Sequence, residues 1–111
     1  MTEEPHYYEL VFEVARHIPA GRVTTYGAIA NYLCLGSARM VGWALHQCAA
    51  GPSDVPAHRV VNRLGELSGR HHFRPPGAMQ ERLEAEGVTV ADDRVADFRE
   101  RFWSPEELDN E

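Results

Sequence analysis

The stretch TTYGAIANYLCLGSARMVGWALHQC, Thr24 to Cys48, decides the fold. Thr25 can accept the free amide groups at the start of a helix, which predicts a helix over residues 26–33. Leu35 and Gly36 form a turn, and Ser37 is a second capping residue before a helix from Ala38 to about Gln47. Two short helices joined by a few residues that include glycine are typical of a helix-turn-helix, whose second helix is presented to a groove.

The second of these helices is built largely from small residues. Arg39 is the only charge in its first turns, and Met40, Val41, Ala44 and Leu45 are available for the core. Glycine in the middle of a helix costs about 1 kcal/mol relative to alanine. Gly42 therefore indicates that something packs closely there, either another helix of the same core or the backbone of DNA.

The segments on either side complete a small domain. Tyr7, Leu10, Val11, Val14 and Ile18 form one apolar stripe of a helix that Pro19 to Gly21 ends. Residues 56–61 are predicted to form a short strand that residues 62–65 turn into a hairpin, which makes a wing. Residues 70–77 are expected to be a loop, and residues 78–86 a last helix stopped by Gly87. Residues 88–90 are typical of a small strand. The aromatic residues Phe98, Phe102 and Trp103 are expected to anchor a tail to the core.

The predicted fold class is therefore mainly α: a three-helix, winged-helix-like helix-turn-helix bundle with a small β wing and an additional C-terminal helix. Residues 1–105 are expected to form the domain, and the acidic residues 106–111 a flexible, disordered tail.

Charge is unevenly distributed along the 111 residues. The net charge is −6, which taken alone argues against nucleic acid, because neutralisation of phosphates supplies most non-specific affinity. Between Arg16 and Arg74, however, the only acidic residues are Asp54 and Glu66. All basic residues are arginine, a preference that genome composition or adaptation to salt explains better than function. The basic middle of the chain thus keeps a nucleic-acid partner open.

The sequence has no apolar run of the roughly 18 residues that would span a bilayer, and no apolar leader, so a cytoplasmic protein is expected. Cys34 and Cys48 are expected to be free thiols, with Cys34 inert in the middle of a helix. His46, Cys48, His71 and His72 lack the spacing of metal ligands, so we expect neither a metal nor another cofactor.

The loop VPAHRVVNRLGELSGR, Val55 to Arg70, has the polar composition of an active-site loop without a nucleophile. His58 beside Arg59 could be a general base, but a histidine is more often a hydrogen-bonded structural residue. The residue before His58 is Ala57, which can do no chemistry.

Four segments carry a resemblance to a known family: GRVTTYGAIA, SARMVGWAL, VPAHRVVNRLGELSGR and LEAEGV. Together they resemble the DNA-binding domain of O6-alkylguanine-DNA alkyltransferases, and more closely the non-enzymatic alkyltransferase-like proteins. The match runs from about Tyr8 to Val90, and Phe102 to Pro105 is similar to the ending of the alkyltransferase-like proteins. The alkyltransferases have a cysteine where this chain has Ala57, whereas the alkyltransferase-like proteins usually have tryptophan and sometimes alanine.

The resemblance implies a DNA-binding surface and a pocket for a flipped base. Tyr26 would press on the phosphate and sugar 3′ to the target nucleotide, and Arg39 would enter the duplex from the minor groove and fill the vacated space. Arg70 would lie over the alkylated base by a cation–π contact. The implied DNA-binding residues are Thr25, Tyr26, Ser37, Ala38, Arg39 and Gly42. The implied lesion pocket consists of Tyr26, Pro56, Ala57, Val60, Ser68 and Arg70.

No catalytic residue is expected. His58 and Glu86 match the relay that activates the family's cysteine, and without a thiol they are vestigial. The chain also departs from the family at His46-Gln47-Cys48, where an Arg-x-Asn segment, whose asparagine braces the active-site turn, is replaced.

The implied function is recognition of DNA damage. The protein is expected to act as a monomer, free of any membrane, that flips and binds O6-alkylguanine in duplex DNA without alkyl transfer. It would associate with the nucleoid and mark the lesion for nucleotide excision repair proteins. Two alternatives stay open: an active alkyltransferase that uses Cys34 or Cys48 as a displaced nucleophile, and a winged-helix regulator with a vestigial pocket.

Overall fold

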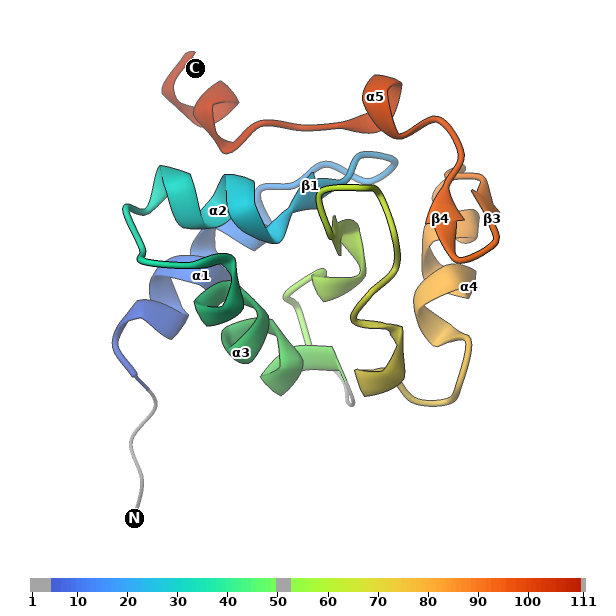
Figure 1. Ribbon diagram of the computed structural model, residues 1–111, viewed down its shortest axis with the longest axis horizontal. Helices are drawn as coiled ribbons and strands as arrows, with labels where there is room; N and C mark the ends of the chain where they lie inside the picture. The colour runs from blue at the N-terminus through green and yellow to red at the C-terminus, as the bar shows by residue number, and fades with distance from the viewer. Residues whose placement is uncertain (1–4, 50–52, 111) are drawn as a thin grey trace.

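The computed structural model describes residues 5–49 and 53–110 and confirms a mainly α fold with small strands (Figure 1). The helices are α1 (Tyr7–Arg16), α2 (Tyr26–Tyr32), α3 (Ala38–Ala49), α4 (Ala78–Ala85) and α5 (Phe98–Arg101), with 3-10 turns η1 (Ala57–Arg59), η2 (Arg70–His72) and η3 (Pro105–Asn110). The strands are β1 (Thr24–Thr25), β2 (Val60–Val61), β3 (Val90–Ala91) and β4 (Arg94–Val95). The sequence predicts a loop over residues 49–54, but Ala49 is the last residue of α3, and residues 50–52 lie outside the described ranges.

The helix-turn-helix forms from local capping interactions. Thr25 has extended backbone angles, and its hydroxyl accepts the amide of Ala28 at 3.0 Å, so α2 begins at Tyr26 as predicted. Beyond Tyr32 the amide of Leu35 donates to the carbonyl of Ala30 at 2.9 Å, across Cys34 in the left-handed region at φ 58°. This is the hydrogen-bond pattern of a Schellman helix end. α3 then follows and packs against both α1 and α2.

The expected place of Cys34 in the middle of a helix is therefore wrong. Cys34 occupies the residue just past the end of α2, where glycine is usual, and its side chain is exposed. α2 ends at Tyr32, one residue before the predicted end, which leaves the cysteine in the turn.

The core forms where α1 packs on α3 and on the segments that follow. Val11, Val14 and Ile18 are buried as the apolar stripe predicts, whereas Leu10 is 44% exposed, which corrects its assignment to the core. Phe12 and Ala15 are buried instead, so the buried face of α1 is turned away from Leu10. From α3, Val41, Ala44 and Leu45 are buried and Met40 is half-buried.

The two strand pairs differ from the predicted hairpin. β1 pairs with β2 in parallel, Thr24 opposite Val60 and Thr25 opposite Val61, and residues 57–59 form the turn η1 instead of a strand. The hairpin predicted at residues 56–65 is therefore wrong, although the amide of Asn62 does donate to the carbonyl of Glu66 at 3.1 Å. The antiparallel wing is β3–β4, whose turn residues Asp92 and Asp93 have φ of 53° and 58°. A two-residue hairpin with a type I′ turn requires positive φ at both positions, which aspartate tolerates better than most residues.

α4 ends at Ala85, one residue before the predicted end, and Gly87 follows its C-cap Glu86 with φ of 89°, so the predicted stop at this glycine is confirmed. None of the helices within residues 5–49 and 53–110 combines the length and the apolar character needed to cross a bilayer.

The C-terminal segment returns to the start of the helix-turn-helix, above α2 in Figure 1. The amide of Trp103 donates to the carbonyl of Val23 at 2.7 Å, and the amide of Val23 donates to the carbonyl of Arg101 at 3.0 Å. Trp103 is buried, and Phe98 and Phe102 are half-buried with their rings 6.0 Å apart. The predicted aromatic anchor of the tail thus agrees with these contacts.

Acidic residues of η3 also contact the body of the protein. Tyr32 donates its hydroxyl to Asp109 at 3.0 Å, and Arg22 lies 3.4 Å from Glu107. The acidic composition of this end predicts disorder, whereas Glu107 and Asp109 have these contacts; Glu111 lies outside the described residues. The boundary at residue 105 between a domain and a flexible tail stays a prediction.

Candidate nucleic-acid interface

An open groove of about 350 Å³ lies between the helix-turn-helix and the loop that contains η2. Four of the residues expected to bind DNA line it: Tyr26, Ala38, Arg39 and Gly42. Thr25 caps α2 and lines a different cavity, with Arg63 and Phe98, and Ser37 is exposed just before α3. The fold thus brings most of the residues implied by the resemblance to one surface.

Tyr26 lies on one wall of the groove, at the first position of α2. Burial raises the pKa of the Tyr26 hydroxyl, and a hydrogen bond with Ser68 opposes this rise. A Cβ atom on Gly69 would lie 2.7 Å from the Tyr26 hydroxyl oxygen, a distance that real Cβ atoms do not tolerate. Gly69 therefore allows the phenol to lie against the loop, and it fixes the width of the groove at this end.

Arg39 and Gly42 are both open to the groove. Within residues 5–49 and 53–110, the guanidinium of Arg39 forms neither a hydrogen bond nor an ion pair, and its side chain is exposed. Around the Cβ position of Gly42, the nearest atoms outside the backbone of α3 are those of the His46 ring, at 3.9 Å. Of the two explanations for Gly42, close packing by another helix of the core is thus not found among the described residues.

Four further residues that sequence reasoning did not assign line the same groove: Trp43, His46, Gly69 and His72. The rings of His46 and His72 are stacked with centroids 3.5 Å apart and planes at 19°. Burial lowers the pKa of His46, and repulsion by His72 lowers it further. Trp43 could have been found from its place one turn after Arg39 on α3, but the loop residues have no such local signal.

The residues implied for the lesion pocket are divided among several places. Tyr26 and Ser68 line the groove. Ala57 is only 6% exposed and Val60 is completely buried, both within the hydrophobic core. Pro56 lines another cavity of about 370 Å³, together with Cys48 and His58.

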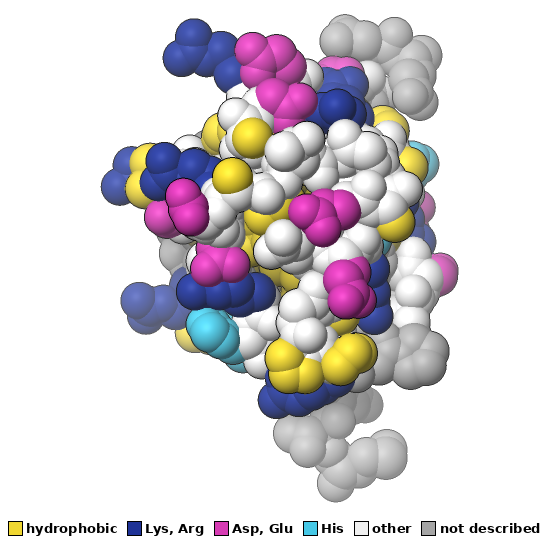
Figure 2. Space-filling view, turned by 90° about the vertical axis from the view of Figure 1, so that its right-hand side faces the viewer, with side chains coloured by type: hydrophobic (Ala, Val, Ile, Leu, Met, Phe, Trp, Pro, Cys, Tyr) yellow, Lys and Arg dark blue, Asp and Glu magenta, His cyan; other side chains and the backbone are white. Residues whose placement is uncertain are grey.

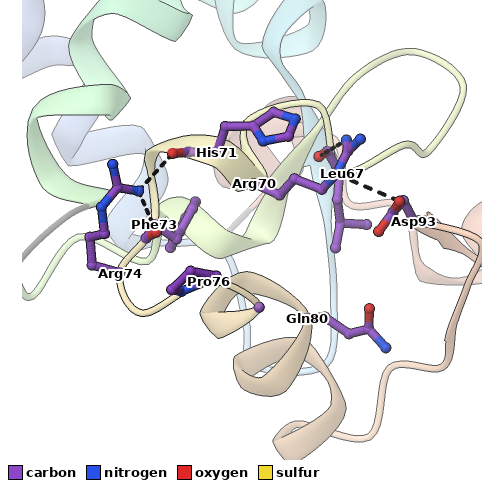
Figure 3. Close-up of a pocket in the computed structure, with 9 residues that line it drawn as sticks. Leu67, Arg70, His71, Phe73, Arg74, Pro76, Gln80 and Asp93 are labelled. Carbon is purple, nitrogen blue, oxygen red and sulfur yellow. Dashed lines mark hydrogen bonds and ion pairs between the residues drawn. The ribbon is translucent and has the colours of Figure 1, made fainter.

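Arg70 lines a different cavity from the groove. Figure 3 shows its guanidinium beside Asp93, at 3.6 Å, where it also donates to the carbonyl of Leu67 at 3.0 Å. These residues line a third cavity of about 340 Å³, at whose other end Arg74 donates to the carbonyls of His71 and Phe73. In this structure Arg70 is thus not placed over a base held against Tyr26.

His58 and Glu86 form a half-buried cluster with Arg59. The Nε2 of His58 lies 3.0 Å from the Glu86 carboxylate, and the Nε of Arg59 donates to the same carboxylate at 3.0 Å. Burial lowers the pKa of His58 in spite of the adjacent Glu86. Burial disfavours the Glu86 carboxylate, but hydrogen bonds from Arg59 and His58 outweigh this effect and leave its pKa lowered. The imidazole is therefore held neutral beside an ionised carboxylate.

The two thiols lie in different environments. Cys34 is exposed at the end of α2, away from the groove. Cys48 is half-buried and lines the cavity that also contains Pro56 and His58. No group of three metal-ligating side chains occurs among the described residues.

The charge of the groove differs from that of two other cavities. Of the described residues that line it, none is acidic, as is also true of the cavity at Thr25 and Arg63, whereas the cavities at Arg70 and at His58 include Asp93 and Asp54. Figure 2 shows the side of the molecule formed by α4 and the β3–β4 hairpin, where acidic and arginine side chains alternate. A surface without carboxylates suits a polyanion, because no like charge repels its phosphates.

Comparison with known proteins shows the family to which this chain is similar. The family described as "6-O-methylguanine DNA methyltransferase, DNA binding domain" matches residues 6–88. The chain is 35% identical over 104 residues to Alkyltransferase-like protein 1 of Schizosaccharomyces pombe, covering 89% of this chain and 95% of that protein. It is 39% identical over 98 residues to a DNA base-flipping protein of Vibrio parahaemolyticus, covering 86% and 93%.

Solved structures agree with the sequence relatives. S. pombe Atl1 in complex with damaged DNA containing O6-carboxymethylguanine superimposes with a TM-score of 0.80 at 32% identity, over 94% of this chain and all of that chain. Mycobacterium tuberculosis OGT in complex with DNA matches with a TM-score of 0.63 at 29% identity, over 76% of this chain and 51% of that one. The mainly helical fold with a small wing is common to this chain and these proteins.

Proposed function

The chain belongs to the family of the 6-O-methylguanine DNA methyltransferase DNA-binding domain, and from this membership we propose that it recognises damaged DNA. It binds duplex DNA that contains O6-alkylguanine, flips the alkylated nucleotide without removing its alkyl group, and marks the site for nucleotide excision repair. The observation that supports this best is the groove, whose described lining has no carboxylate. It brings Tyr26 together with Arg39, which has no partner among the described residues.

Each wall of the groove has a part in the proposed binding. Ala38 and Gly42 let the backbone of α3 approach the minor groove closely, because neither has a bulky side chain. Arg39 is free to enter the base stack, and Tyr26 to press on the sugar and phosphate of the flipped nucleotide. Extrusion of a base costs a few kcal/mol, which an inserted cation and an aromatic wedge offset.

We place the flipped base at the end of the groove where Tyr26 meets Ser68. These are the two implied pocket residues that line it. Ala57 lies in the core and does not line the groove, and Arg70 is held by Leu67 and Asp93. Closure of Arg70 over an alkylated base would therefore require that its contact with Asp93 be released.

The proposed absence of alkyl transfer rests on residue 57. A methyl group has no nucleophilic atom, so the neutral His58 beside Glu86 has no thiol to activate at this position. One observation favours a second candidate: Cys48 lines the same cavity as Pro56 and His58, so a displaced nucleophile is conceivable for an alkyltransferase. That cavity is distinct from the groove that holds Tyr26 and Arg39.

Two measurements test the proposal. Binding of one short duplex with and without O6-methylguanine is measured by fluorescence anisotropy, and we expect clearly tighter binding of the lesion. Equal affinity for both duplexes would favour a winged-helix regulator with a vestigial pocket.

In the second measurement the protein is incubated with duplex that carries a radiolabelled O6-methyl group. We expect no label on the protein. Stoichiometric label that disappears in Cys48→Ser would establish the alkyltransferase, and the corresponding result with Cys34→Ser would assign the displaced nucleophile to the exposed thiol.

A further inference from the structure

Trp43 is an exposed tryptophan on the helix that faces the groove. Half of its side chain is exposed, and it lines the groove together with Arg39 and Tyr26. A tryptophan carries more apolar surface than any other side chain, so leaving half of it in water forgoes much of the free energy that burial would supply. Leu10 and Leu64 have similar exposed fractions, but neither lines the groove.

The direction of Trp43 follows from helical geometry. Residues four apart on a helix differ by about 40° around its axis, so Trp43 lies next to Arg39 on one face. Ala38 and Gly42 lie on the opposite side of Arg39, toward the floor of the groove. A ligand that rests on this floor and receives Arg39 would therefore contact the indole of Trp43 at the rim of the groove.

The surroundings of Trp43 indicate the chemistry of the ligand that would bind in the groove. The groove combines an unpaired guanidinium with the rings of Tyr26, Trp43 and the stacked His46 and His72, and its described lining contains no carboxylate. Such a surface suits a partner that is anionic and also has flat or apolar faces. A nucleic acid strand has both properties, because charged phosphates alternate with sugar rings and bases.

We propose that Trp43 is a further DNA-contacting residue, whose indole packs against the deoxyribose rings along one wall of the minor groove. This inference rests on the proposed function, because it requires a duplex seated in the groove. The carbon-bound hydrogens of the sugars offer an apolar surface that is the same at every nucleotide. Trp43 thus strengthens binding without regard to sequence or lesion, while Arg39 acts on the base pair.

The test compares Trp43→Ala with the unchanged protein on two duplexes, one with O6-methylguanine and one unmodified. We expect affinity to fall about tenfold on both duplexes, because the lost contact is made to sugars in either case. Trp43→Phe keeps an aromatic face and should recover part of the loss. Leu10→Ala, which removes an exposed leucine of α1, is the matched control and should bind as the unchanged protein does.

A second readout needs no substitution. The protein has two tryptophans, and Trp103 is buried whereas Trp43 is exposed, so acrylamide quenches mainly the fluorescence of Trp43. Bound DNA should protect this fluorescence from the quencher. Protection absent at saturating DNA would overturn the inference even if a variant failed to fold.

The remaining outcomes separate the inference from the function on which it rests. Unchanged affinity of Trp43→Ala on both duplexes would overturn the sugar contact and leave lesion recognition intact. A loss confined to the lesion duplex would also overturn it, since the indole would then act on the flipped nucleotide. Failure of the unchanged protein to prefer the lesion would contradict the proposed function, whatever the variant does.

Discussion

Glu86 shows how a single carboxylate can join distant segments of the chain. It accepts hydrogen bonds from Arg59 and His58 in η1, and Arg59 also donates to the carbonyl of Ile18 at 2.7 Å. The side chains of Arg59 and Glu86 are only 18% and 17% exposed. Under the proposed function this cluster has no thiol to activate, so we expect it to contribute to the stability of the fold.

Replacing Glu86 should therefore destabilise the fold. We expect Glu86→Gln to lower the free energy of unfolding by about 2 kcal/mol, because Arg59 keeps its charge in a largely buried place without a carboxylate. Urea denaturation measures this change. The control is Glu84→Gln on the exposed surface of α4, which should stay within about 0.5 kcal/mol. Equal effects of the two substitutions would show that the cluster adds nothing beyond a surface pair.

The same cluster predicts a pH dependence of stability. The pKa values of His58 and Glu86 are both lowered in the folded protein, from ordinary values of 6.5 and 4.5. The unfolded chain thus binds more protons below these values, and the free energy of unfolding falls as pH drops through 6.5 and again through 4.5. His46 has a lowered pKa as well and contributes in the same direction.

Denaturation in urea at a series of pH values checks this dependence. His58→Gln should flatten the slope just below pH 6.5. A slope of the opposite sign would mean that His58 is charged in the folded protein.

Gly69 is the third residue whose surroundings predict an effect. A Cβ atom there would collide with the Tyr26 hydroxyl at 2.7 Å, whereas its φ of −88° is acceptable to any residue. Gly69→Ala should thus displace the phenol in the groove and weaken binding of the lesion duplex about tenfold, with little change in stability. Gly36→Ala is the control, because its Cβ would meet only the sulfur of Met40, at 4.0 Å. Unchanged binding by Gly69→Ala would show that the position of Tyr26 is unimportant.

At the scale of elements, α3 presents small residues and a single arginine to the groove. Arg39 has no partner among the described residues, so it is available without the loss of an ion pair. The sequence predicted this helix correctly, because it depends on residues that are close together in the chain.

Arg39→Ala should affect extrusion of the base more than contact with the backbone. We expect it to weaken binding to a lesion in a paired duplex by about tenfold or more, and to a lesion in an unpaired bulge much less, because the bulge needs no extrusion. Competition titrations on the two substrates measure the difference. Equal losses would indicate that Arg39 contacts only a phosphate, and Arg63→Ala serves as a control for the removal of an arginine outside the groove.

At the scale of the whole molecule, the C-terminal segment closes the fold over its start. Trp103 is 4% exposed and pairs through its amide with Val23, immediately before β1. Arg22 supports this closure, since it donates to the carbonyls of Arg101 and Phe102 at 3.1 and 2.6 Å. The helix-turn-helix is thus supported from behind by residues that lie some 80 positions further along the chain.

Loss of this closure should be costly. Trp103→Ala should lower the free energy of unfolding by about 4 kcal/mol, because it leaves a large cavity in the core. Trp43→Ala removes the same side chain from a half-exposed position and should lower the free energy of unfolding much less. Thermal and urea denaturation of both variants provide the comparison. A small effect of Trp103→Ala would mean that the segment after residue 101 is an independent tail.

The parts of this protein that the sequence alone determined are those set by neighbouring residues. The cap of Thr25, the two helices that follow and the stop at Gly87 were predictable, because helix ends and helical faces depend on residues within four or five positions. The family resemblance added roles for Tyr26, Arg39 and Ala57, which stay predictions where no measurement has tested them.

Only the tertiary structure decided which remote residues meet. Strand β2 pairs in parallel with β1, Val60 opposite Thr24, although the helix-turn-helix separates the two strands in the sequence. His72 of η2 stacks on His46 of α3. Arg70 contacts Asp93, although the resemblance implied a place over the base. A parallel pair or a stacked ring is stabilised by burial and hydrogen bonds between distant segments, and no periodicity within a single segment specifies its partner.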